Sequence, residues 1–265
     1  MSHSLDGTTR LFPIIGDPVK YVRAPQVLSA GLAARGYNGM CVPAEVPDGA
    51  LAEVMRGLAL TKNVDGLLVT MPHKFKAASF CGTTSDRSKL LGAVSVTRRN
   101  ADGSWHGDIL DGLAFVKAQI DAGATIKGAR ILLIGAGAAG SAIAVALLDS
   151  GARELIVHDV EGSRAQALLK VLESVGPGRI ICGSADPTDC DMVCNASSSG
   201  MAAGDPIPVE ATLLKSTMFV GDVIAGHGLT PFLQAAQAAG CKTANGDEMV
   251  EAQQEMMLDF LLIGR

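Results

Sequence analysis

The sequence lacks several patterns that would assign it to other classes of protein. It has no run of basic residues and its net charge is −5, which argues against binding to nucleic acid or to an anionic membrane surface. Its first residues, MSHSLDGTTR, contain no apolar stretch like that of a signal peptide, so we expect a cytoplasmic protein. With 265 residues, the chain can form one large domain or two modest ones.

Cysteine and histidine are present, but not in the patterns that bind metals. The six cysteines are scattered without C-x-x-C spacing, and the five histidines form no H-E-x-x-H motif. In a chain of this length, such cysteines are typical of reduced thiols in the core of a cytosolic protein. We therefore expect free thiols and neither a structural nor a catalytic metal site.

The most informative stretch covers residues 131–148, ILLIGAGAAGSAIAVALL. Its first four residues form an apolar run typical of a strand buried on both faces. Gly135, Gly137 and Gly140 then fit G-x-G-x-x-G, and an alanine-rich segment with good helix propensity follows. Three glycines and many alanines make the stretch only mildly apolar, so it is not expected to span a membrane.

The order of these residues has a specific physical meaning. The first glycine permits a tight turn from strand to helix, and the second lets a pyrophosphate lie against bare backbone. The third lets helix and strand pack closely, while the unpaired N–H groups at the helix start attract phosphates. The predicted dinucleotide-binding residues are Gly135, Ala136, Gly137, Ala138, Ala139 and Gly140.

The following segment supports this prediction. Residues 153–158 (RELIVH) are predicted as the next strand, which ends at Asp159, nineteen residues after Gly140. An acid at that place can hydrogen-bond the adenosine ribose 2′-OH and repel a 2′-phosphate, so NAD is favoured over NADP. The alternative is an ordinary glycine-rich turn with a chance acid downstream, but strand, fingerprint, helix, strand and acid all occur in order.

Strand and helix patterns alternate along the rest of the chain. Predicted strands are 11–15, 40–43, 66–70, 92–98, 105–107, 179–182, 192–195, 218–223 and 241–244. Predicted helices are 25–35, 48–59, 111–122, 231–239 and 248–262. The alternation predicts parallel strands with ligands gathered at their carboxyl ends, and residues 100–103 are predicted to form a hairpin turn.

These patterns predict an α/β protein with two domains. We expect an N-terminal α/β substrate-binding domain with a mostly parallel sheet in residues 1–113. We expect a C-terminal Rossmann domain in residues 114–247, with the last segment, 248–265, packing back on the first domain.

Three segments of the first half match motifs of one enzyme family. Residues 69–74 (VTMPHK) are similar to its N-V-T-V-P-F-K segment, and residues 91–97 (LGAVSVT) to A-G-A-V-N-T. Residues 107–112 (GDILDG) are similar to G-D-N-T-D-G. In the second half, residues 195–201 (NASSSGM) and 230–232 (TPF) match N-A-T-S-S-G-M and T-P-F, and residues 246–253 resemble G-L-G-M-L-V-x-Q. In this order, the motifs resemble the shikimate/quinate dehydrogenase family over essentially the whole chain.

The resemblance implies an NAD- or NADP-dependent oxidoreductase that acts on a ring secondary alcohol such as shikimate, quinate or a related cyclic hydroxy acid. It implies that Lys74 and Asp111 are the catalytic pair, and a Lys–Asp pair can relay the hydroxyl proton. Without the resemblance, Lys74 would be taken for a surface lysine and Asp111 for a helix cap. The substrate-binding positions that it implies are Val22, Ala24, Thr70, Ser95 and Gln253. Its further cofactor-binding positions are Asp159, Arg164, Asn195 and Ser197.

Some positions depart from the family pattern. Val22 and Ala24 stand where the family has two serines that hold the substrate carboxylate, and Leu68 and Ser95 replace two asparagines. Ala225 replaces a tyrosine, so much of the polar cradle is exchanged for apolar or smaller groups. Shikimate itself is therefore in doubt, and a less polar alcohol is an open alternative.

Other residues bear on these departures. The residues that could supply replacement contacts are Tyr21, Arg23 and His73. Arg164 resembles the arginine that contacts the 2′-phosphate in NADP-using relatives, so NADP remains possible beside NAD. Alternatives are an ordinary shikimate dehydrogenase with compensating residues, and a dinucleotide-responsive binding or regulatory protein without turnover. We expect a small-molecule substrate and a monomer or homodimer.

Overall fold

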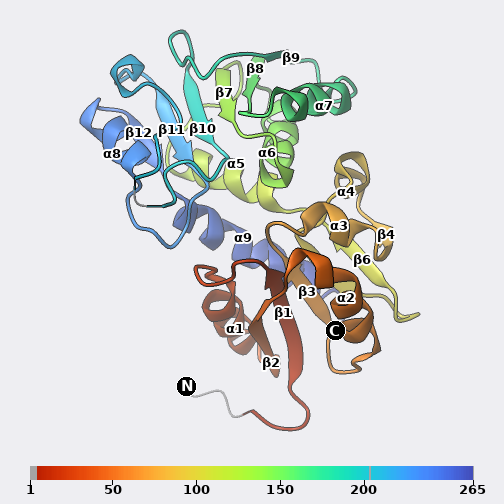
Figure 1. The fold of residues 1–265 in the computed structure, drawn as a ribbon. Helices are drawn as coiled ribbons and strands as arrows, with labels where there is room; N and C mark the ends of the chain where they lie inside the picture. Colours follow the sequence, from red (N-terminus) through yellow and green to blue (C-terminus); the bar gives the residue numbers. More distant parts are fainter. Residues whose placement is uncertain (1–4, 203, 265) are drawn as a thin grey trace. The chain divides into compact units, whose positions relative to one another are not determined.

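The computed structural model describes residues 5–202 and 204–264, which confirm the predicted α/β class. The chain divides into two compact units (Figure 1). The first unit contains Met1–Leu110 and Gln253–Arg265, and the second contains Asp111–Ala252. The binding roles expected for the two domains stay a prediction.

The first unit contains a six-stranded sheet with the order β2-β1-β3-β5-β6-β4. Its strands are β1 (Arg10–Gly16), β2 (Gly39–Glu45), β3 (Gly66–Val69), β4 (Cys81–Thr84), β5 (Val96–Arg99) and β6 (Trp105–Asp108). Its helical segments are α1 (Ala24–Ala34), η1 (Asp48–Ala50), α2 (Leu51–Leu60), α3 (Lys74–Ala78), α4 (Asp86–Leu91) and the end of α9 (Gly246–Leu261).

Parallel and antiparallel pairs both occur in this sheet. β1 pairs in parallel with β2 and β3, whereas β5 is antiparallel to β3 and β6. The hairpin expected at residues 100–103 is confirmed, because the Gly103 N–H donates to the Asn100 carbonyl at 3.0 Å and Gly103 has a φ of +86°. The predicted, mostly parallel sheet is thus confirmed, and the predicted hairpin joins the antiparallel strands β5 and β6.

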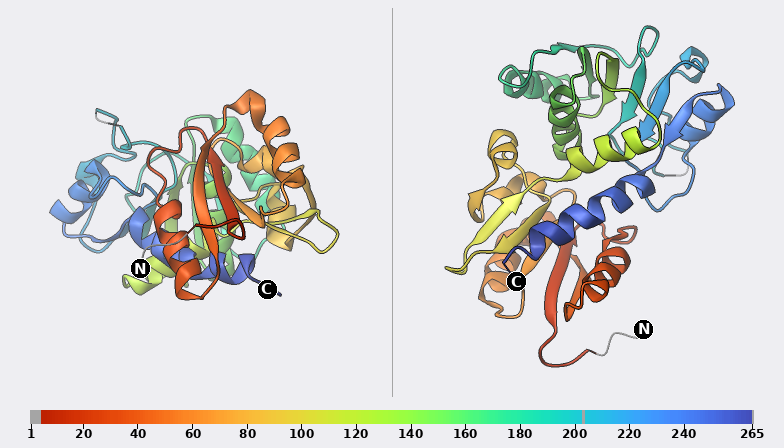
Figure 2. Two further views of the ribbon diagram at one scale, coloured as in Figure 1. Left: turned by 90° about the horizontal axis from the view of Figure 1, so that it is seen from below. Right: turned by 180° about the vertical axis from the view of Figure 1, so that it is seen from behind.

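Helices cover both faces of the first sheet. On one face, α1 and the end of α9 close an apolar cluster that includes Phe12, Leu28 and Leu258 (Figure 2). Contact there is tight, because a Cβ at Gly31 would lie 2.5 Å from a methyl carbon of Leu258. On the other face, α2 and α3 contribute Met55 and Ala77 to a second cluster.

The second unit contains a parallel sheet with the order β12-β11-β10-β7-β8-β9. Its strands are β7 (Arg130–Ile134), β8 (Glu154–His158), β9 (Arg179–Cys182), β10 (Met192–Asn195), β11 (Phe219–Asp222) and β12 (Lys242–Ala244). Its helical segments are α5 (Asp111–Asp121), α6 (Ala138–Asp149), α7 (Gly162–Leu172), η2 (Ala211–Leu213), α8 (Pro231–Ala238) and the start of α9. The chain reverses direction across the sheet between β7 and β10, which is where doubly wound sheets bind ligands.

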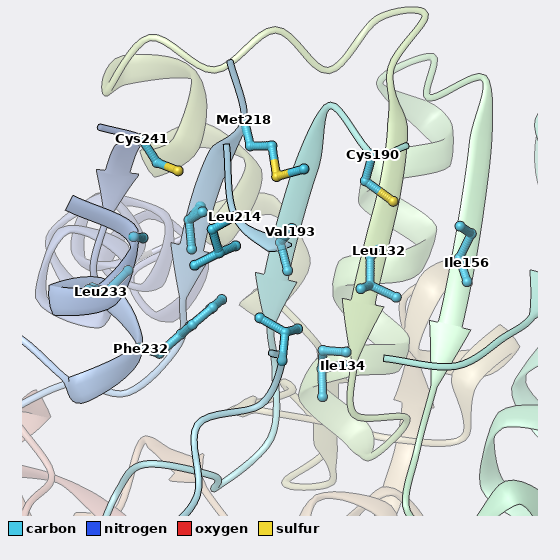
Figure 3. Packing of buried hydrophobic residues seen from close by; sticks show 13 residues of the cluster. Leu132, Ile134, Ile156, Cys190, Val193, Leu214, Met218, Phe232, Leu233 and Cys241 are labelled. Atoms are coloured by element: carbon cyan, nitrogen blue, oxygen red, sulfur yellow. The ribbon is translucent and has the colours of Figure 1, made fainter. Parts of the chain in front are cut away.

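One face of this sheet packs against α8 and the segment around η2. Leu132, Val193 and Val220 of the central strands contact this layer, to which α8 contributes Phe232 and Leu233 (Figure 3). Elsewhere in the unit, α5 and α6 pack closely, since a Cβ at Gly112 would lie 2.0 Å from the carbonyl oxygen of Ala142.

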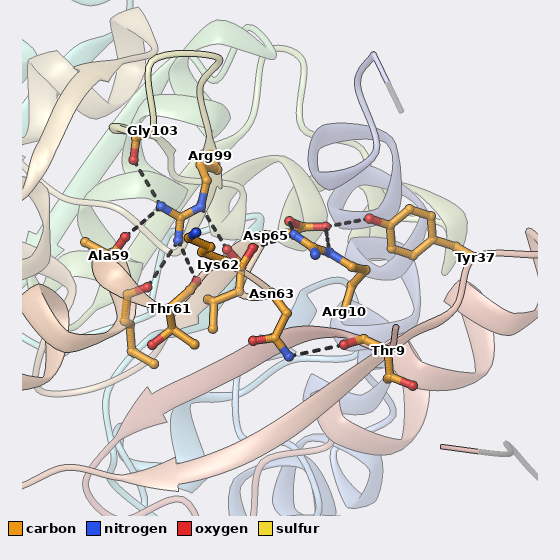
Figure 4. A network of polar contacts seen from close by, with 12 residues as sticks. Thr9, Arg10, Tyr37, Ala59, Thr61, Lys62, Asn63, Asp65, Arg99 and Gly103 are labelled. Atoms are coloured by element: carbon orange, nitrogen blue, oxygen red, sulfur yellow. Dashed lines mark hydrogen bonds and ion pairs between the residues drawn. The ribbon is translucent and has the colours of Figure 1, made fainter. Parts of the chain in front are cut away.

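Polar side chains lie at the end of the first sheet where β1 and β3 begin and β5 ends. The Arg99 guanidinium donates to the carbonyls of Leu58, Ala59 and Thr61 at the end of α2, and also to those of Val64 and Gly103 (Figure 4). The buried Asp65 carboxylate accepts bonds from Arg10 and from the Tyr37 hydroxyl. The Arg99 bonds satisfy carbonyls that the end of α2 leaves without partners.

The six cysteines are all free thiols, but they are not all in the core. Cys182 is exposed and Cys81 is half-buried, so the expectation of core thiols is wrong for these two. In the part of the chain that the structure describes, no helix is long and apolar enough to cross a bilayer.

Candidate active site

Each glycine of the turn after β7 meets a different constraint. Gly135 has a φ of +100°, and a Cβ there would lie 2.8 Å from backbone atoms of Ala196. A Cβ at Gly140 would lie 2.0 Å from the Gly135 carbonyl oxygen, so α6 starts against the turn. A Cβ at Gly137 would meet no atom within 4 Å. Packing therefore requires the first and third glycines but not the second, which leaves the second for the close approach of a ligand.

Asp159 lies beside this turn. One oxygen of its carboxylate accepts from the Ala136 N–H at 2.7 Å, and the other accepts from the Glu161 N–H at 2.8 Å. The side chain is half-buried. The predicted strand and acid thus bring a negative charge against the fingerprint loop, within reach of the ribose end of any dinucleotide held there.

The residues after Asp159 set the charge around it. Glu161 accepts from Arg164 at 2.9 Å, and both side chains are more than half exposed. Val160 is 93% exposed and brings no charge. Arg164 is therefore paired with an acid of its own helical turn, and the nearby charges of Asp159, Glu161 and Arg164 sum to −1.

The loop after β10 runs past the fingerprint turn. Asn195 is fully buried, and its side-chain oxygen accepts from the Ser197 N–H at 3.1 Å and from the Ser197 hydroxyl at 2.6 Å. Its amide donates to the Ser199 carbonyl and to the Asp222 carboxylate. Both predicted residues therefore shape the loop from within, and their contact with a cofactor stays a prediction.

Asp222 lies next to this loop, and the sequence analysis did not single it out. It ends β11 directly beside Asn195 in the sheet and is fully buried. Burial raises its pKa, while hydrogen bonds from Thr230, Ile224 and Asn195 lower it. The available signal was an acid and an asparagine at the carboxyl ends of two apolar strands.

Lys74 is the first residue of α3, just beyond the carboxyl end of β3. The His73 N–H donates to the Thr70 carbonyl at 3.0 Å, and the Val94 N–H donates to the Lys74 carbonyl at 3.0 Å. The lysine side chain is half-buried. Asp111 is 5% exposed and begins α5.

The loops after β1 and β3 are joined by backbone bonds. The Asp17 N–H donates to the Met71 carbonyl at 3.0 Å, and the Thr70 N–H donates to the Ile15 carbonyl at 2.9 Å. A Cβ at Gly16 would lie 2.2 Å from the Thr70 methyl carbon, so this contact requires glycine. Thr70 and the segment before α1 therefore lie on one edge of the first sheet.

The positions that depart from the family pattern are packed into protein. Val22 and Ala24 are partly buried against the α1 and α9 cluster, and Leu68 is 1% exposed within it. Ser95 is 2% exposed, and its hydroxyl accepts from the Leu110 N–H at 3.0 Å. Gln253 is 9% exposed. None of the first three side chains can donate a hydrogen bond to a carboxylate, whereas the Ser95 hydroxyl only accepts in its bond with Leu110, which does not use its O–H.

Of the suggested replacement contacts, His73 is excluded. Its side chain is fully buried, and its Nε2 lies 2.6 Å from the Val46 carbonyl oxygen, so it is a packing residue, which is the default role for such a histidine, and not a replacement contact. Tyr21 and Arg23 are exposed, and the Lys20 ammonium lies 5.3 Å from the centre of the Tyr21 ring. Among the described residues, no group of three or more His, Cys, Asp or Glu side chains could hold a metal ion.

Comparison with known proteins places this geometry in a family. The model for the shikimate dehydrogenase substrate binding domain matches residues 14–97, which include Lys74. Shikimate dehydrogenase (NADP(+)) of Rubrobacter xylanophilus is 35% identical, over 94% of this chain and 91% of that protein. The chain belongs to the shikimate dehydrogenase family. It is therefore a member of a family of NAD(P)-dependent oxidoreductases.

Solved structures of other proteins share the fold of this family member. Quinate dehydrogenase from Corynebacterium glutamicum, in complex with NAD, has a TM-score of 0.85 and 27% identity, covering 96% of this chain and 94% of that one. The 5-ketofructose reductase of a Gluconobacter strain has a TM-score of 0.83 and 26% identity, covering 97% and 94%.

Proposed function

We propose that this protein catalyses reversible hydride transfer between a nicotinamide dinucleotide and a ring secondary alcohol. Shikimate, quinate or a related cyclic hydroxy acid would be oxidised to the corresponding ketone. The observation that carries the proposal is the turn at 135–140, in which packing accounts for Gly135 and Gly140 but leaves open space beside Gly137. A pyrophosphate lying against the backbone explains the second glycine.

The chemistry assigned to this chain is proton transfer. The dinucleotide supplies the hydride acceptor or donor when it is bound. Lys74 and Asp111 would take the hydroxyl proton when the alcohol is oxidised and return it when the ketone is reduced. In the reduction direction, the protonated Lys74 ammonium would also stabilise the negative charge that develops on the oxygen.

The cofactor is NAD or NADP, and we propose that NAD is preferred. A 2′-phosphate would approach the Asp159 carboxylate and be repelled by it. Arg164, which could offset that repulsion, pairs with Glu161. Relatives of this chain are named as NADP(+) enzymes, so a preference for NAD would set this protein apart from them. NAD should give a higher kcat/KM than NADP, and Asp159→Ala should lower the ratio of the two values. An equal or higher kcat/KM with NADP in the unmodified protein would contradict the preference.

We propose that the substrate carboxylate is not bound by the residues that bind it in other members of the family. A carboxylate in an apolar pocket without donors is costly by several kcal/mol, and positions 22, 24 and 68 offer none. Arg23 and Lys20 are exposed and bring positive charge to the segment before α1. The fold also occurs in a protein named as a 5-ketofructose reductase, which supports a wider range of ring or sugar alcohols.

A steady-state screen tests the function. Shikimate, quinate, related cyclic alcohols and 5-ketofructose would each be offered with NAD(H) and NADP(H). Turnover with one of the cyclic hydroxy acids supports the proposal, while binding of NADH without turnover of any compound supports a dinucleotide-responsive regulatory protein. The cytoplasmic location and the monomeric or homodimeric state stay predictions.

A further inference from the structure

Asp222 connects three segments of the second unit at the carboxyl ends of its strands. Its Oδ1 accepts from the Asn195 amide at 3.0 Å and from the Ile224 N–H at 3.1 Å. Its Oδ2 accepts from the Thr230 hydroxyl at 2.7 Å. A fully buried carboxylate with three such donors is a rigid junction, because a bond lost there is not replaced by a hydrogen bond to bulk water.

The bond to Asn195 leads toward the fingerprint turn. Asn195 lies between Ile134 and Asp222 in the sheet and holds Ser197 and Ser199 through its side chain. The next residue, Ala196, donates to the Ile134 carbonyl at 2.7 Å and lies directly against Gly135. The loop after β10 is thus fixed beside the turn after β7, where the sheet reverses direction and a dinucleotide would bind.

The bond to Thr230 leads to a different element. Thr230 is the N-cap of α8, and its hydroxyl also accepts from the Leu233 N–H at 3.3 Å. This side of the junction supports α8 and its apolar contacts. The two sides of Asp222 can therefore be tested separately.

We propose that Asp222 is a positioning residue for the dinucleotide site, acting through Asn195 on the loop of residues 196–199. The proposal rests on the proposed function, in that the crevice between β7 and β10 binds NAD. Without the junction, the loop would have to be ordered when the dinucleotide binds, and that cost lowers the affinity.

The test is the Kd of NADH, measured by its fluorescence on titration and independent of turnover. Asp222→Ala should raise the Kd about tenfold. Asp222→Asn is the conservative rescue, since its amide oxygen can still accept from Asn195 while its amide nitrogen faces Thr230, and it should stay within about threefold of the unmodified protein. Asn195→Ala should match Asp222→Ala, and the double variant should lose little more.

Two controls separate positioning from general loss of stability. Thr230→Val removes the bond toward α8 and should lower Tm with little change in Kd. Glu154→Gln alters another buried acid of the same unit, which accepts from Arg130 at the amino end of β8, and should also lower Tm alone. An unchanged Kd in folded Asn195→Ala, or a Kd raised equally by Glu154→Gln, would overturn the proposal. If the unmodified protein binds neither NADH nor NADPH, the proposed function fails first.

Discussion

The turn after β7 and the loop after β1 both leave a sheet at its carboxyl edge, yet they differ in what they offer a ligand. The turn presents backbone, and a Cβ at Gly135 or Gly140, its first and third glycines, would lie only 2.8 or 2.0 Å from backbone atoms. The loop presents side chains, and Val22 and Ala24 occupy the positions that were predicted to bind the substrate carboxylate.

This difference explains why the turn after β7 follows the family pattern, whereas the segment with Val22 and Ala24 does not. A site made of backbone atoms needs residues without side chains, so nearly any substitution at Gly135 or Gly140 creates a steric clash. A side-chain site changes its ligand by exchanging residues while the strand and helix around it stay in place. Val22 and Ala24 pack against apolar neighbours, so the exchange is compatible with the fold.

The largest expected effect concerns the proposed proton relay. Lys74→Ala or Asp111→Asn should lower kcat by roughly 10²-fold or more and leave the Kd of NADH nearly unchanged. Lys76→Ala is the matched control, since Lys76 lies on the same short helix and pairs with Asp48, and it should keep its kcat. Because both residues would act on one proton, the double variant should lose little beyond the worse single one. Fully additive losses would show that they do not work together.

The next effect would break the backbone site. Gly140→Ala should raise the Kd of NADH more than tenfold and lower stability by about 1–3 kcal/mol, because its Cβ has no room. Gly137→Ala should leave the denaturation midpoint nearly unchanged but raise the Kd of NADH, since only the ligand needs the space beside this residue. A Gly137→Ala variant with unaltered affinity would argue that no pyrophosphate lies there.

A smaller effect is expected at the side chains of the loop after β1. Serine at both Val22 and Ala24 should lower the KM for shikimate about tenfold, because hydrogen bonds to a charged group are restored. Val22→Ala with Ala24 unchanged removes bulk without adding a donor and should give no gain. The unmodified protein should show a poor KM but measurable kcat for shikimate. A low-micromolar KM would mean that other donors, Arg23 first, already hold the carboxylate.

The smallest effect concerns the cofactor's ribose end. Glu161→Ala should release Arg164 and shift the ratio of kcat/KM for NAD over NADP about threefold toward NADP, since exposed ion pairs are weak. Arg164→Ala in the same background should reverse the shift. A ratio that does not move in Glu161→Ala would show that Arg164 does not reach the 2′-phosphate.

Sequence patterns predicted the elements that carry long apolar runs or glycine constraints. Residues 131–134 and the fingerprint predicted β7 and α6, and the hairpin at 100–103 is present. By contrast, α3, β4 and α4 were not predicted. They have four to six residues each, and β4 (CGTT) has no buried position. Tertiary contacts decide such short segments more than local propensity does.

The candidate site shows the same division. The glycine pattern predicts the cofactor turn because each glycine reflects a local steric requirement. The burial of His73 and the junction at Asp222 instead depend on residues that are distant in sequence. His73 is bonded to Val46, and Asp222 to Asn195. No local pattern distinguishes such a buried side chain from an exposed one.

The path of α9 has a consequence for how the chain is made. The first unit is not continuous in sequence, because its apolar cluster takes Leu258, Phe260 and Leu261 from the last residues. The second unit is one uninterrupted stretch. During synthesis, the amino-terminal residues of the first unit therefore emerge first, but its core is complete only after the second half of α9 has left the ribosome, later than every residue of the second unit.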